Sequence, residues 1–214
     1  MLNKINLLSY PISEKTPTYG NRNKLKIQPL TSIKNGDTAN SSKWIFETNH
    51  IGTHIDFPRH FSINGKTIDD YKPSDWVFEK IGIIDTDITN FENELFKVND
   101  DIEFLIWKSG FGINRERREY WESQPVIPSS FADMICKKFK NLKIFGFDMI
   151  SLTSKLDREE GKRIHEKFLC EYKILIIEDM NLLSLKDKNI KKIVVSPWYV
   201  KGADGSPCSI LSFS

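Results

Sequence analysis

Short apolar runs rich in β-branched and aromatic residues recur along the chain and predict strands. These strands are expected at residues 43–48, 81–87, 103–107, 142–147, 174–177 and 193–195. The run 174–177 is wholly apolar, which is typical of a central strand buried on both faces. The pattern therefore predicts a sizeable sheet.

Two segments have helical rather than strand spacing. Apolar residues recur every four positions over residues 129–139, which predicts a helix with one buried face. A second helix is expected over residues 157–169, because Asp157 followed three positions later by Glu160 resembles a capping box. Helices and strands are mixed along the chain, so the fold class is α/β or α+β.

Length and charge limit the classes of protein that fit. A chain of 214 residues is expected to form a single domain over residues 1–214. Its 31 basic and 29 acidic residues nearly cancel, so the charge gives no support for a nucleic-acid partner. The basic run at residues 115–118 contains a glutamate and is interpreted as a solvated surface loop or helix, with a phosphate or substrate contact as the alternative.

Membrane insertion and secretion are not expected. The chain has no run of eighteen apolar residues and no apolar signal segment near its start. The three cysteines, Cys136, Cys170 and Cys208, are an odd number without CxxC spacing. This usage predicts reduced thiols and a cytoplasmic location.

The histidines carry the strongest chemical signal. Three of the four, with one aspartate, fall within residues 50–60, and the fourth, His165, lies thirteen positions before Glu178. Neutral imidazole and carboxylate are the usual ligands of zinc, and they also suit manganese or iron. The sequence therefore predicts a divalent metal site.

Geometry limits how the chain can run through residues 50–60. On a strand His50 and His54 would lie roughly 13 Å apart, which is too far for one ion. In a helical turn such a pair lies about 6 Å apart. We therefore expect the chain to leave the extended conformation near His50 and to curl at Gly52. Pro58 should stop any helix from running on.

Glu178 follows the apolar run 174–177, where a buried acid is costly unless it is paired or bound to metal. His165, on the preceding helix, is close enough in sequence to face the same site. Either residue taken alone could be structural or a surface group. Two histidines and a carboxylate satisfy one ion. Asp56, Glu178 and His165 could supply a second ion, with the carboxylates bridging, which leaves His60 free for proton transfer.

The segment His50–Phe61 resembles the HxGTHxDxPxHF signature of the cyclase family of metal-dependent hydrolases, which includes bacterial kynurenine formamidase and isatin hydrolase. All eight defined positions are present. Other segments that resemble the family follow in the expected order: residues 9–12, 16–19, 108–111, 146–151, 165–182 and 202–207. The resemblance therefore spans nearly the whole chain.

This resemblance implies a swivelling β/β/α domain with a mixed sheet and flanking helices, assembled as a homodimer or homotetramer. The ligands that it implies are His50, His54 and Asp56 for a first ion, and Asp56, His165 and Glu178 for a second. His60 is the implied catalytic acid/base. Zinc is the expected metal, manganese is an alternative, and the number of ions, one or two, stays open.

The implied activity is hydrolysis of a C–N amide bond in a small molecule, as in an arylformamidase. Opening of a cyclic amide or lactone is an alternative, as is a non-catalytic metal- or ligand-binding role, in which His60 would have no purpose. The sequence departs from the family pattern at Leu8, Tyr19, Lys108 and Ser209. None of these is an implied ligand, but they weaken any transfer of the kynurenine substrate.

Overall fold

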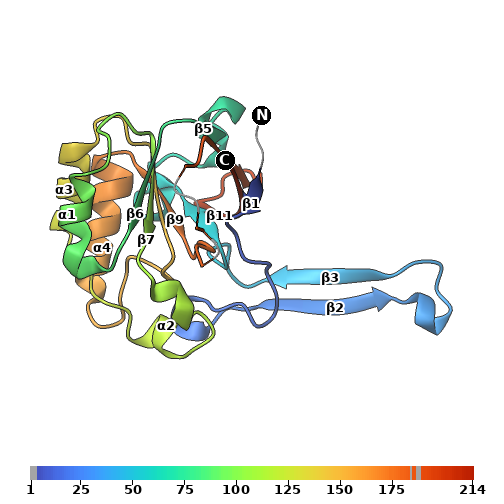
Figure 1. Cartoon of the computed structure of the whole chain (residues 1–214). Coiled ribbons are helices and arrows are strands. Elements are labelled where there is room, and N and C mark those ends of the chain that lie inside the picture. The colour runs from blue at the N-terminus through green and yellow to red at the C-terminus, as the bar shows by residue number, and fades with distance from the viewer. Residues whose placement is uncertain (1–3, 184, 187–188) are drawn as a thin grey trace.

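The computed structural model describes residues 4–183, 185–186 and 189–214, and it is built around one mixed sheet (Figure 1). Its strands are β1 (Ile5–Leu7), β4 (His54–Asp56), β5 (Val77–Phe78), β6 (Ile81–Asp85), β7 (Phe104–Lys108), β8 (Ile144–Phe147), β9 (Leu175–Glu178), β10 (Lys192–Pro197) and β11 (Gly205–Phe213). The order across the sheet is β5-β10-β11-β4-β9-β8-β7-β6, with β1 also paired to β11.

The sheet divides at β9. Strands β6, β7, β8 and β9 run parallel, whereas β4, β11, β10 and β5 continue the sheet with antiparallel pairing. Strands β8 and β9 are buried along their whole length, as parallel strands covered on both faces usually are. The predicted central position of the run 174–177 is therefore confirmed.

Helices cover one face of the parallel half (Figure 1). The α-helices are α1 (Phe91–Leu95), α2 (Glu119–Glu122), α3 (Ser130–Lys138) and α4 (Arg158–His165). The rings of Phe91, Trp107 and Phe131 pack against one another between α1, β7 and α3. The predicted mixed sheet with flanking helices is confirmed, while the single-domain organisation stays a prediction.

The second predicted helix is present, but it changes type along its length. Its α-helical part ends at His165, and one π-helical turn, Glu166–Glu171, follows. Asp157 is the N-cap and accepts a hydrogen bond from the Glu160 amide, as expected. Glu160 does not return the bond, because its carboxylate accepts from the Ser129 amide instead. Only half of the predicted capping box is therefore present.

A two-stranded hairpin of β2 (Leu25–Thr31) and β3 (Ser41–Phe46) projects from the body of the molecule (Figure 1). Ile27 pairs with Trp44 across the hairpin, and the Trp44 side chain is 59% exposed. An isolated hairpin is marginally stable in water. The Trp44 ring on this arm is therefore largely open to solvent.

None of the described helices has the length and apolar character needed to cross a membrane. The three cysteines are all unpaired, as their number and spacing predicted.

Candidate metal centre

All the sequence-predicted site residues meet at one cavity of about 310 Å³. They are His50, His54, Asp56, His60, His165 and Glu178. Strand β4 supplies two of these residues and its neighbour β9 supplies Glu178, which pairs in register with His54. The cavity therefore lies where the parallel and antiparallel halves of the sheet meet.

The path of the chain into the site differs from the expected helical turn. Gly52 has φ +62°, so the chain does leave the extended conformation there. It then enters strand β4 rather than a helix, which places His54 and Asp56 on the same face of the sheet. His50 reaches the site from before the turn. Pro58 begins a 3₁₀ turn, Pro58–His60, instead of ending a helix.

Two buried histidines present the same ring nitrogen to the centre of the site. Nδ1 of His54 lies 2.8 Å from the Gly52 carbonyl oxygen, and Nδ1 of His165 lies 2.6 Å from that of Gly161. A carbonyl only accepts, so each ring donates through Nδ1–H and keeps Nε2 free. These Nε2 atoms lie 3.4 Å and 3.2 Å from the two oxygens of Glu178.

Asp56 is the common neighbour of the histidines. Its Oδ1 lies 2.8 Å from His50 Nδ1 and 3.5 Å from His54 Nε2, and its Oδ2 lies 3.9 Å from His165 Nε2. The Asp56 side chain is only 2% exposed. A buried carboxylate among three imidazoles is well placed to bridge two cations.

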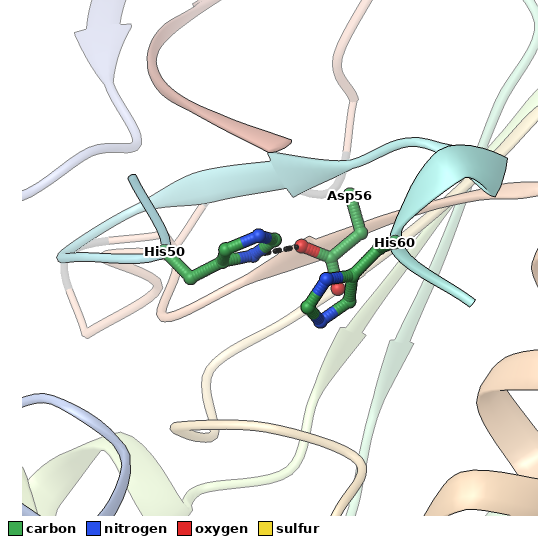
Figure 2. Close-up of side chains that lie close together, drawn as sticks. All are labelled: His50, Asp56 and His60. Carbon is green, nitrogen blue, oxygen red and sulfur yellow. Dashed lines mark hydrogen bonds and ion pairs between the residues drawn. The ribbon is translucent and has the colours of Figure 1, made fainter. Parts of the chain in front are cut away.

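His60 lies at the outer edge of the cluster, where it and His50 lie close to Asp56 (Figure 2). The His50 and His60 rings stack with their centroids 4.0 Å apart. His60 Nδ1 lies 3.1 Å from Asp204 Oδ2, and that same oxygen lies 3.3 Å from His50 Nε2. One carboxylate therefore orients both rings.

Within the described residues, two sets of three ligand atoms each fall within 4.8 Å of one another. The sets are His50, Asp56 and His60, and His54, Asp56 and Glu178. Asp56 belongs to both, in keeping with its expected bridging role. His60 stands in the first set where His54 was expected, and His165 lies beside the second. The division of ligands between ions stays a prediction.

Charges within the cluster stabilise one another. Burial lowers the pKa of His50, but the Asp56 and Asp204 carboxylates outweigh it and raise that pKa to about 10. Burial disfavours a charged Asp56, yet the adjacent imidazoles hold its pKa well below the usual range. Burial and the nearby Asp56 carboxylate raise the pKa of Glu178. The hydrogen bonds from His165 and His54 outweigh them, so the pKa of Glu178 is lowered. The Asp56 and Glu178 carboxylates therefore carry negative charge that a divalent cation would compensate.

The residues fit a divalent ion. The donor set combines imidazole nitrogen and carboxylate oxygen, which suits zinc and also manganese. The backbone bonds to Nδ1 of His54 and His165 fix the tautomer that a ligand needs, as partners of metal-bound histidines commonly do. The geometry and chemistry of the cluster agree on a metal centre.

A family model described as "Putative cyclase" matches residues 7–153. The chain belongs to the cyclase family. This family model covers the segment His50–Phe61 and more than half of the chain, and it bears out the resemblance found in the sequence.

Known relatives agree with this membership. The chain is 26% identical to a kynurenine formamidase of Bacillus anthracis over 206 residues, which cover 94% of this chain and 92% of the relative. An isatin hydrolase A of Labrenzia aggregata superposes with a TM-score of 0.79 at 14% identity, covering 98% of this chain and 93% of the other. The structure of a potential metal-dependent hydrolase with cyclase activity superposes with a TM-score of 0.72 at 22% identity, over 98% and 97% of the two chains. The similarity to the formamidase supports a hydrolase of the cyclase family, and the superpositions show that the chain shares the fold of these structures.

Sequence reasoning gave no role to Asp204, although it lies in the cyclase-like segment at residues 202–207. The sequence signal for Asp204 was an acidic residue between Ala203 and Gly205 that lies outside every predicted strand. Of the four departures from the family pattern, only Tyr19 lines the cavity. Lys108 instead contacts Asp85 and the Leu185 carbonyl.

The interpretation of the basic run 115–118 as solvated surface is wrong for Arg115. Its guanidinium forms two-pronged hydrogen bonds with Asp179, which follows Glu178 and has a side chain only 1% exposed. The Tyr120 hydroxyl donates to the same carboxylate at 2.6 Å. Without Arg115, the buried Asp179 carboxylate would have no cation to pair with. Arg115 therefore holds the residue that follows Glu178 in place, instead of lying on the surface.

Proposed function

We propose that this protein hydrolyses the C–N amide bond of a small aryl formamide such as N-formylkynurenine. The observation that carries the proposal is the cavity itself, which gathers five candidate ligands and one further histidine held by a carboxylate. The similarity to a kynurenine formamidase over nearly the full length of both chains supports this choice of substrate.

The chain's own residues divide the work. His50, His54, Asp56, His165 and Glu178 would hold one or two divalent ions, with zinc proposed and manganese an alternative. A bound ion of this kind polarises a carbonyl oxygen and lowers the pKa of water. Because His60 Nδ1 faces Asp204, its Nε2 is the nitrogen available to deliver a proton to the leaving nitrogen.

Aromatic rings shape the cavity around this centre. Phe61 stacks on the His165 ring at a centroid distance of 4.8 Å and lines the cavity together with Tyr19. Two other aromatic residues near residues 50–60 and 108–111 in the sequence, Phe57 and Trp107, are buried in the core instead. Phe61 and Tyr19 are therefore the rings that a flat substrate would meet.

We further propose a cytoplasmic homo-oligomer. The exposed apolar face of the β2–β3 hairpin, with Ile27 opposite Trp44, supports assembly with a second copy of the chain. Burying such a face would supply the apolar contact that an isolated hairpin lacks.

Hydrolysis of N-formylkynurenine and of isatin by the zinc- or manganese-loaded protein tests the proposed activity. We expect turnover of the formamide, and a His60→Gln variant that keeps its metal but loses about 10²- to 10⁴-fold in kcat. Arg59→Gln alters the exposed neighbouring residue and serves as the control. Full turnover by His60→Gln would remove that residue from the chemistry. Turnover of isatin alone would move the substrate class to cyclic amides.

A further inference from the structure

The loop Tyr19–Asn23 forms one wall of the cavity at the metal centre, and its backbone is unusual. Gly20, Asn21 and Asn23 all have positive φ, at 68°, 54° and 56°. Asparagine tolerates this region better than most residues, but two in one short loop still store strain. Such strain persists only where surrounding contacts fix the loop.

Those contacts are present. The Asn21 amide donates to the Thr18 carbonyl at 2.7 Å, and the Thr18 hydroxyl donates to the Arg22 carbonyl. The Lys24 ammonium donates to the Thr16 carbonyl at 2.8 Å and also to the Asn21 side chain. The loop backbone is tied in place, while these bonds leave the Arg22 guanidinium free.

Arg22 is the one lysine or arginine among the described residues that line this cavity. Within residues 4–183, 185–186 and 189–214, the Arg22 side chain makes no hydrogen bond or ion pair. The nearby carboxylate of Glu122 is already bound by Lys155 at 2.7 Å. The cavity therefore has a cation without a fixed partner.

Tyr19, on the same loop, also lines the cavity, so it shares this wall with Arg22. Its hydroxyl is buried and has no hydrogen-bond partner in the described part of the chain. The exposed Arg22 guanidinium is therefore the group on this wall that the oxygen acceptors of a ligand would pair with.

We infer that Arg22 binds an anionic group of the substrate, a carboxylate above all. The inference rests on the proposed function and narrows it from small amides to anionic ones. A guanidinium is planar and pairs with a carboxylate through two parallel hydrogen bonds, which lysine cannot do. A neutral cyclic amide would make no use of this cation.

Two formamides that differ by one carboxylate, 4-formamidobenzoate and formanilide, test the inference with the metal-loaded protein. The wild type should prefer the anionic substrate in kcat/KM, and Arg22→Gln should lose about tenfold on that substrate alone. Arg22→Lys should recover only part of the loss. Arg158→Gln removes another exposed arginine, on α4, and should change nothing. An equal loss on both substrates would overturn the assignment.

A binding measurement separates failure of this inference from failure of the proposed activity. Calorimetric titration of the metal-loaded protein with anthranilate and with its neutral amide needs no turnover. We expect the wild type and Arg158→Gln to prefer the anion about tenfold, and Arg22→Gln to lose that preference. A preference that survives Arg22→Gln would place the anion elsewhere, for example on the metal, and would overturn the inference. So would a wild type without any preference.

Discussion

His60 and Asp204 are 144 positions apart in the sequence, yet His60 Nδ1 lies 3.1 Å from Asp204 Oδ2. The same oxygen faces His50 Nε2, and Asn49 donates to the other oxygen at 2.7 Å. The carboxylate is thus held from one side and orients two imidazoles on the other. It links a proposed ligand of the metal to the proposed acid/base.

Replacing Asp204 by asparagine should lower kcat/KM by about 10- to 100-fold, because groups that orient ligands commonly have effects of this size. The asparagine is neutral, and its NH2 end must face either the two imidazoles or the donating Asn49 amide, so the contacts of the carboxylate cannot all be kept. Steady-state kinetics and metal content would be measured together. Asp101→Asn, at an exposed acid paired with Lys80, provides the control. Unchanged kinetics in Asp204→Asn would show that the contact has no role.

Gly205 leaves space for the His50 ring. A Cβ atom at this position would lie 2.3 Å from His50 Cε1, so Gly205→Ala must displace the imidazole. We expect at least a tenfold weaker metal affinity with the fold retained. Chelator competition gives the affinity and circular dichroism the fold. Gly36→Ala strains the turn of the hairpin, where φ is +94°, but its Cβ would meet no atom within 4 Å, so it should keep the wild-type metal affinity. Equal affinities in both variants would contradict the packing argument.

The Arg115–Asp179 pair should contribute strongly to stability. Arg115→Leu leaves a buried carboxylate without its cation, which should lower the free energy of unfolding by about 3 kcal/mol. Arg163→Leu breaks the exposed pair with Glu160 and should cost at most about 1 kcal/mol. Urea denaturation of the two variants compares them directly. Similar small losses in both would show that Asp179 does not depend on Arg115.

The hairpin face should control assembly. Trp44→Glu places a charge on the exposed apolar face and is expected to shift the proposed oligomer towards monomers. Lys43→Glu alters the adjacent residue, which points to the opposite face of the hairpin, and should preserve the assembly. Light scattering coupled to size-exclusion chromatography reports the mass of each variant. A wild type that is monomeric at every concentration would contradict the assembly proposal.

Much of the site could be predicted because its chemistry is concentrated in one segment. Histidine is rare in this chain, and the spacing of residues 50–60 matches a specific family signature, so the sequence could single out the residues that meet at the cavity. The parallel strands were predictable for a similar reason. Strands buried on both faces read as continuous apolar runs, as β9 does.

The remaining features depend on contacts between distant segments. Strand β4 is only three residues long, which is too short for the alternation of buried and exposed residues to show in the sequence. The helical turn expected at His50–His54 was therefore wrong. Strand β11 alternates weakly and was not predicted, so the position of Asp204 before it could not be seen. Arg115 looked like surface because its partner, Asp179, lies 64 positions away. Local patterns carry no record of such pairs.

The metal content per chain, measured by plasma mass spectrometry on the wild type and His54→Ala, tests the central claim most directly. Hydrolysis of N-formylkynurenine would be followed on the same samples. We predict bound zinc or manganese in the wild type, and loss of both metal and turnover in the variant. A wild type that binds neither metal, even when both are supplied, would contradict the account.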